Sequence, residues 1–418
     1  MPSMVTPVQV NRSEDPNSKG RTALIVAFSS LAALLLLVAP AVATQLQLQL
    51  GFTPSQTGDL FALELGATSL ASLPALYWIK NVNLRTASLA LGVVYVAGNV
   101  VSMFLTTFES LILVRGLTSF AGGSLMVLTM TLAARARNRD RMFGWWTVGQ
   151  IAVGAIALAV LPPMFSAFGI GIFYLSMGVL MALSLPLVRY LPRHPLRPAS
   201  GTVASNRLAQ PNIAKTVLAL VACLLFYVGL ISVWTFMGGF AEAAGIAPGT
   251  TSLILAIATV IGVVGSLAAT MVGGSINRRI VLLGGYLAMI LAIALLFGTD
   301  GALRFGVAAL ILKFAWPWTL PFLMSTLGDL DPQGRASNLA NLAIGGGLAI
   351  GPLIAGRVVE ATGGFDTLAL IGVPVVAVSL VLIFLAQPTR RTAVAAGDPG
   401  EAGEPDQVIA APVASPSS

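Results

Sequence analysis

Charged side chains are scarce in this sequence. They make up only 9% of its 418 residues, whereas hydrophobic side chains make up 56% and the mean hydropathy is +0.88. Ordinary soluble domains carry about 25% charged residues. The composition therefore excludes a water-soluble globular protein and indicates that lipid surrounds most of the chain.

Cysteine and histidine are almost absent. The single cysteine, Cys223, excludes an intramolecular disulfide and a cysteine metal cluster. His194 is the sole histidine, and neither an H-E-x-x-H motif, a paired-acid motif nor a nucleotide-binding P-loop is present. We therefore expect no metal, no cofactor and no enzymatic activity.

Twelve segments are long and apolar enough to span a bilayer as helices, which takes roughly 20 residues each. The prediction is an all-α, polytopic membrane protein. The segments are 22–44, 60–79, 87–105, 111–134, 143–164, 169–188, 216–236, 252–272, 280–297, 305–327, 337–356 and 368–386.

Lysine and arginine gather in alternate loops. If the N-terminus is cytoplasmic, almost all basic side chains between the segments are cytoplasmic, with Arg304 and Arg357 as the exceptions. Because basic loops stay on the cytoplasmic side, we expect both termini in the cytoplasm and the chain in the plasma membrane, here a bacterial inner membrane. The spread of these basic residues over many cytoplasmic loops also explains the net charge of +7, so we expect no nucleic acid as a partner.

The longest polar stretch between segments, 189–215, separates six segments from six and is rich in Pro, Ser, Ala and Arg. We expect two pseudo-symmetric six-helix bundles, residues 21–190 and 215–391, joined by a cytoplasmic linker, 191–214. The ends, 1–20 and 392–418, have few aromatic residues and many Pro, Gly, Ser and acidic residues, a composition typical of disordered tails.

Six helices, a basic linker and six more helices resemble the major facilitator superfamily, and the similarity covers residues 21–391. On the fourth segment, Arg115 is followed by small residues, as in the superfamily's motif there, with Ser119 where glycine is usual. The loops after segments two and eight keep basic residues but lack the superfamily's aspartate. A glycine-proline motif that resembles the superfamily's helix-packing motif lies on the eleventh segment, at Gly347, Gly351, Pro352 and Gly356.

The resemblance implies a secondary active transporter that works by alternating access, with a site near the midplane between the two bundles. Its partners would be a small-molecule substrate, protons and the lipid bilayer, and we expect a monomer. Two intramembrane cations against one acid favour an organic anion, and nearby aromatic residues favour an amphipathic solute. A transporter-like sensor, an uncoupled facilitator and a channel remain alternatives, and an integral membrane enzyme is the least favoured of them.

Charges within spanning segments are costly and point to function. Glu64 and Arg115 each lie about one turn from the outer ends of their predicted segments, so we expect an ion pair. One interpretation is proton coupling, in which protonation of Glu64 weakens the pair. The other is a permanent pair that holds two helices in register.

Lys313 lies eight residues beyond the start of its segment, about 12 Å deep, and no acid is expected at that depth in the second half. Its ammonium therefore either binds an anion in the cavity or extends to the lipid headgroups by snorkelling. The resemblance places its helix beside the central cavity. Further substrate-binding candidates are four aromatic residues and two amides. The aromatic residues form a predicted cavity wall, with packing as the alternative role, and the amides have contacts between helices as the alternative role. They are Tyr227, Trp234, Trp316 and Trp318, and Gln150 and Asn341.

Overall fold

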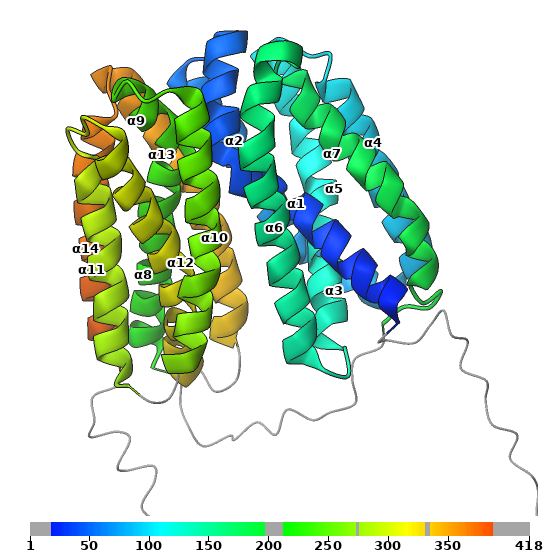
Figure 1. Ribbon diagram of the computed structural model, residues 1–418. Helices are drawn as coiled ribbons and strands as arrows, with labels where there is room; N and C mark the ends of the chain where they lie inside the picture. Colours follow the sequence, from blue (N-terminus) through cyan, green and yellow to red (C-terminus); the bar gives the residue numbers. More distant parts are fainter. Residues whose placement is uncertain (1–17, 197–211, 273–275, 331–334, 388–418) are drawn as a thin grey trace, which may run out of the picture. The chain divides into compact units, whose positions relative to one another are not determined.

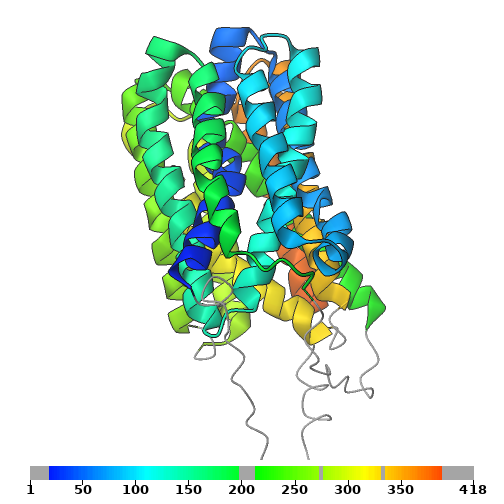
Figure 2. The ribbon, with the colours of Figure 1, turned by 90° about the vertical axis from the view of Figure 1, so that its right-hand side faces the viewer.

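The computed structural model describes residues 18–196, 212–272, 276–330 and 335–387, and the described residues up to Ala386 form one compact unit. Within the described ranges the chain is helical, without a strand, and has 12 helical spans long and apolar enough to cross a membrane. Figures 1 and 2 show these helices running side by side. The predicted all-α, twelve-span architecture is confirmed. The predicted C-terminal tail, residues 1–17 of the predicted N-terminal tail and residues 197–211 of the predicted linker lie outside the described residues, whereas Lys19 and Gly20 belong to the first helix.

Seven α-helices and a 3₁₀-helix form the N-terminal half, and seven α-helices form the C-terminal half. The first set is α1 Lys19–Leu50, α2 Pro54–Leu70, α3 Ser72–Asn81, α4 Leu84–Ser102, α5 Phe108–Ala134, α6 Arg139–Phe168, α7 Gly171–Ser184 and η1 Leu185–Tyr190. The second set is α8 Ile213–Thr235, α9 Met237–Ala243, α10 Pro248–Val272, α11 Arg278–Leu296, α12 Ala302–Leu330, α13 Arg335–Thr362 and α14 Asp366–Ala386.

The second span begins six residues earlier than the sequence predicts. Thr53 accepts a hydrogen bond from the backbone N–H of Gln56, and the Gln56 side chain accepts one from the Thr53 N–H. This capping box, followed by Pro54 in the first turn, fixes the helix start among polar residues. Glu64 consequently lies ten residues inside α2, about 15 Å along the helix, rather than one turn from its end.

The two halves meet closely where α2 lies beside α13 (Figure 1). A Cβ atom on Gly58 would collide with the carbonyl oxygen of Pro352, and one on Gly356 would collide with the carbonyl oxygen of Pro54. Only glycine allows backbones to approach so closely. We call this end of the molecule, at which α1 passes into α2, the closed end.

Polar contacts join the halves at the closed end as well. Arg357 donates a hydrogen bond to Asp59 at 2.6 Å, and the backbone N–H of Ser55 donates to Glu360 at 2.9 Å. The Arg357 side chain is 54% exposed, so its ion pair contributes at most about 1 kcal/mol. Close backbone packing is therefore the main source of closure here.

The packing at Gly58 makes a first prediction. Gly58→Val is expected to separate α2 from α13 and to shift the protein toward a form open at this end, since overpacking costs about 1–3 kcal/mol. Spin labels at Thr106→Cys and Asp300→Cys, exposed positions in loops of opposite halves at this end, would report a longer distance. Gly284→Val is the matched control because no atom lies within 4 Å of a Cβ there; an equal shift in both variants would contradict the prediction.

Candidate central transport site

A cavity of about 370 Å³ lies between the two halves. Helices α1, α2, α4, α5, α6 and α7 line it from the N-terminal half, and α8, α10, α12 and α13 from the C-terminal half. Its walls are largely aliphatic and aromatic, with a small number of polar groups that include Glu64, Arg115, Gln150 and Lys313. Both the size and this lining are typical of small-molecule sites, which span roughly 300–1,000 Å³.

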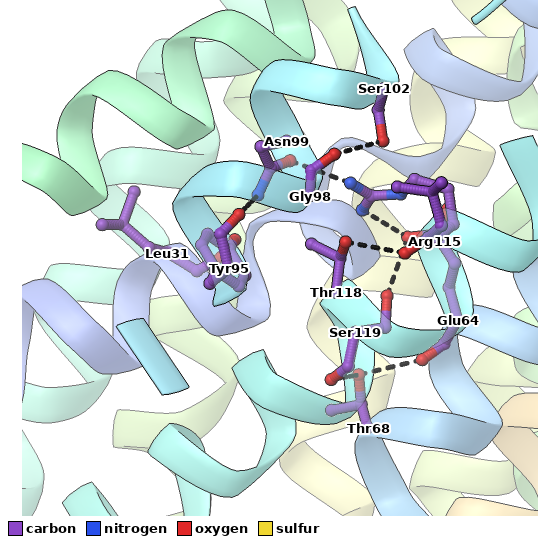
Figure 3. A network of polar contacts seen from close by, with 11 residues as sticks. Leu31, Glu64, Thr68, Tyr95, Gly98, Asn99, Ser102, Arg115, Thr118 and Ser119 are labelled. Carbon is purple, nitrogen blue, oxygen red and sulfur yellow. Dashed lines mark hydrogen bonds and ion pairs between the residues drawn. The ribbon is translucent and has the colours of Figure 1, made fainter. Parts of the chain in front are cut away.

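Glu64 and Arg115 are in direct contact on the N-terminal side of this cavity (Figure 3). Arg115 Nη2 donates to Glu64 Oε2 at 2.5 Å, and Ser119 Oγ donates to the same oxygen at 3.0 Å. Arg115 Nη1 donates to Asn99 Oδ1 at 2.8 Å, and its guanidinium lies 4.8 Å from the ring centroid of Tyr174. The carboxylate and the guanidinium are thus both held by several neighbours.

Small residues on α5 bring the pair together. A Cβ atom on Gly123 would collide with the backbone of Thr68 on α2. Thr68 Oγ1 in turn donates to the carbonyl oxygens of Glu64, at 2.9 Å, and Ser119, at 3.3 Å. The small-residue run after Arg115 therefore sets the register between α2 and α5 that aligns carboxylate and guanidinium.

Glu64 and Arg115 are both nearly fully buried, at 2% and 1% exposure. Removing one partner of such a pair leaves an uncompensated buried charge, which costs about 3–5 kcal/mol. Protonation of Glu64 would likewise remove the negative charge that balances Arg115. The geometry suits both a proton-sensitive pair and a permanent structural pair.

Lys313 lies on the opposite side of the cavity, in the C-terminal half. Its side chain is 4% exposed, and its Nζ lies 4.0 Å from the ring centroid of Trp234 and 5.0 Å from that of Trp316. It does not snorkel to a membrane surface. Across the described ranges Lys313 forms no ion pair, so the two indole faces are the groups seen to stabilise its ammonium.

Only two of the four residues of the predicted aromatic wall line the cavity. Tyr227 and Trp316 line the cavity, with Trp316 Nε1 donating to Tyr227 Oη at 3.4 Å. Trp318 does not line it, because two residues turn an α-helix by about 200°, and its Nε1 donates to the Val281 carbonyl on α11. Trp234 is fully buried behind Lys313 and is not part of the lining.

The two amide candidates also differ. Gln150 lines the cavity, and its buried Nε2 has no hydrogen-bond partner among the residues described. Asn341 is exposed and lies outside the lining, which on α13 includes Ile344 and Leu348. Since Asn341 is only six residues from the start of α13, it lies nearer the helix end than the cavity does.

The glycine-proline motif of α13 has a packing role on two sides. Gly347 and Gly351 face α8, where a Cβ on Gly351 would lie 3.0 Å from the carbonyl oxygen of Val228. Gly356 faces α2 at the closed end, next to Pro54. The motif thus brings α13 close to one helix of its own half and one of the other.

A family model described as Major Facilitator Superfamily matches residues 22–341. The chain belongs to this superfamily. Among solved structures, the nucleoside transporter NupG is similar, with a TM-score of 0.69 and 16% identity over 88% of this chain and 98% of that chain. A D-xylose-proton symporter gives a TM-score of 0.68 and 13% identity over 88% and 97% of the two chains. No curated protein sequence matches significantly.

Membership of the Major Facilitator Superfamily makes the chain a multi-pass membrane transporter rather than an enzyme, as the sequence predicts. At these identities the similarity to NupG and to the symporter shows a shared fold alone. Within this fold, the cavity described above lies between the N-terminal and C-terminal halves.

Proposed function

We propose that the protein is a proton-coupled secondary active transporter for a small organic solute that carries a negative charge and an apolar portion. One observation carries this proposal. The same cavity is lined by a buried, titratable carboxylate, Glu64, on one half and by a cation without a described acidic partner, Lys313, on the other.

Two donors in the cavity are available for an anionic group. Lys313 Nζ is stabilised by rings rather than by a carboxylate, and Gln150 Nε2 is unsatisfied by any residue described. A carboxylate or similar group would accept charge-assisted hydrogen bonds from both. The aliphatic lining and the Tyr227–Trp316 pair would accommodate an apolar portion.

Proton coupling would run through the Glu64–Arg115 pair. With Glu64 ionised, the pair is balanced and holds α2 to α5; with Glu64 protonated, Arg115 is left with Asn99 and the Tyr174 ring as partners. The two forms differ in how strongly α2 and α5 are held together, so protonation would bias the exchange between inward- and outward-open forms. The D-xylose-proton symporter with the same fold is consistent with such coupling.

We place the closed end outside and both termini in the cytoplasm of the inner membrane, following the distribution of basic residues. With this orientation, the closed end corresponds to an inward-facing or occluded form, and we propose that the transporter acts as a monomer. Uptake by symport and export by antiport would both use Glu64.

The testing experiment is proton flux into proteoliposomes that contain a pH-sensitive dye. Organic acids with apolar groups are added outside, alongside neutral sugars, nucleosides and amphipathic cations. A pH change with the acids alone would support the proposal. A pH change with sugars or nucleosides alone would overturn the anionic substrate class, and solute flux without a pH change would identify an uncoupled facilitator.

A further inference from the structure

A proline in α1 exposes a backbone carbonyl that the opposite half of the protein uses. Pro40 lies inside α1 and has no N–H, so the Leu36 carbonyl lacks its usual partner four residues later. Trp234 Nε1, on α8 of the C-terminal half, donates to this carbonyl at 2.8 Å. Trp234 is 0% exposed, so the bond forms away from water, and separation of the halves here would break it.

The other surface of the same indole holds the charge in the cavity. Lys313 Nζ lies 4.0 Å from the Trp234 ring centroid. An indole whose N–H donates to a carbonyl is polarised, and its face becomes a better partner for a cation. The hydrogen bond to α1 and the contact with Lys313 therefore strengthen one another through a single side chain.

Trp234 also lies where its helix is interrupted. It occupies the last turn of α8, and α9 begins at Met237 after a break at Phe236. Just beyond the break, a Cβ atom on Gly238 would lie 2.7 Å from the carbonyl oxygen of Pro40. The indole thus connects the cavity to the segment that packs against α1 toward the closed end.

We propose that Trp234 is a positioning residue of the transport cycle, which joins the halves through the proline-freed Leu36 carbonyl and places the Lys313 ammonium at the cavity. An anion that draws the ammonium away from the indole weakens the bond to α1, so occupancy of the cavity favours opening at the closed end. This last step rests on the proposed anionic substrate, whereas the connection between α8 and α1 does not.

The test measures the open and closed populations without any substrate, from the distance between spin labels at Thr106→Cys and Asp300→Cys. Native Cys223 is fully buried and is therefore not expected to take up the label. Trp234→Phe keeps the ring but loses the donor, and it is expected to raise the open population on the order of tenfold. Pro40→Ala supplies an N–H that competes for the Leu36 carbonyl within α1, so it is expected to weaken the bond from Trp234. Because both changes act on the same bond, the double variant should open no further than Trp234→Phe alone.

The matched control is Trp318→Phe, which removes an equivalent indole bond to a backbone carbonyl, Val281, but within the C-terminal half. It should leave the populations unchanged. Lys313→Met should open the protein when Trp234 is present and have a smaller effect with Trp234→Phe. Additive effects of the Trp234 and Pro40 changes, or an equal shift with Trp318→Phe, would overturn the proposal. Because no solute is needed, this result is independent of the flux assay.

Discussion

Glu64→Gln is expected to abolish uphill accumulation of substrate driven by a pH gradient in proteoliposomes, while exchange of substrate down its own gradient continues. The amide has the size of the carboxylate and keeps an oxygen for Ser119 and Arg115, but it does not take up or release a proton. Coupling is lost because a proton can no longer neutralise the side chain at position 64 and so bias the exchange between the two forms.

Stability has to be separated from coupling in this experiment. Glu64→Gln leaves Arg115 buried without its counter-charge, at a cost of about 3–5 kcal/mol, so a lower melting temperature is expected. The double variant Glu64→Gln/Arg115→Gln removes both charges and should recover much of that stability without recovering coupling. Glu64→Asp retains a titratable group and should keep part of the coupled transport.

Gradient-driven accumulation that survives in Glu64→Gln would show that the pair is structural. In that case the double variant would behave like the native protein in transport, since helix register is set by the close contacts between α2 and α5 rather than by a proton. The two interpretations of the pair therefore differ in transport, while both predict a loss of stability in the single variant.

The fold was predictable because each span needs a long apolar run, and such runs are visible in the sequence. Helix ends were less predictable, since polar capping residues such as Thr53 and Gln56 extend α2 beyond its apolar part. As a result, the depth predicted for Glu64 was wrong. The contact between Glu64 and Arg115 was predicted from their similar distances to the helix ends. Both distances are longer in the structure, with Glu64 ten residues inside α2 and Arg115 seven residues inside α5.

The residues around the charges were harder to predict than the charges themselves. Ser119 and Asn99 contact the pair because glycines such as Gly98 and Gly123 allow α2, α4 and α5 to pack closely. The sequence marked Ser119 merely as a departure from the superfamily's motif. Trp318 was placed with Trp316 because the two are close in sequence, although helix geometry turns them to different sides.

The Lys313 ammonium at the cavity is expected to determine the preference for anionic substrates. Lys313→Met is expected to reduce transport of anionic substrates roughly tenfold or more, the value of a charge-assisted hydrogen bond of about 1.5–3 kcal/mol. Neutral compounds that enter the same cavity should be affected little. The measurement is the ratio of initial uptake rates for an organic acid and a neutral analogue of similar size, compared between the variant and the native protein.

Stability provides an independent check on this role. A buried ammonium held by two rings without a described counter-ion is costly, and methionine fills a similar volume without charge. Lys313→Met should therefore raise the melting temperature while it weakens anion transport, whereas a lysine needed for folding would lower it. Lys313→Arg, which keeps the charge, should preserve the preference for anions. Equal loss of acid and neutral transport in Lys313→Met, with a lower melting temperature, would contradict a substrate-binding role.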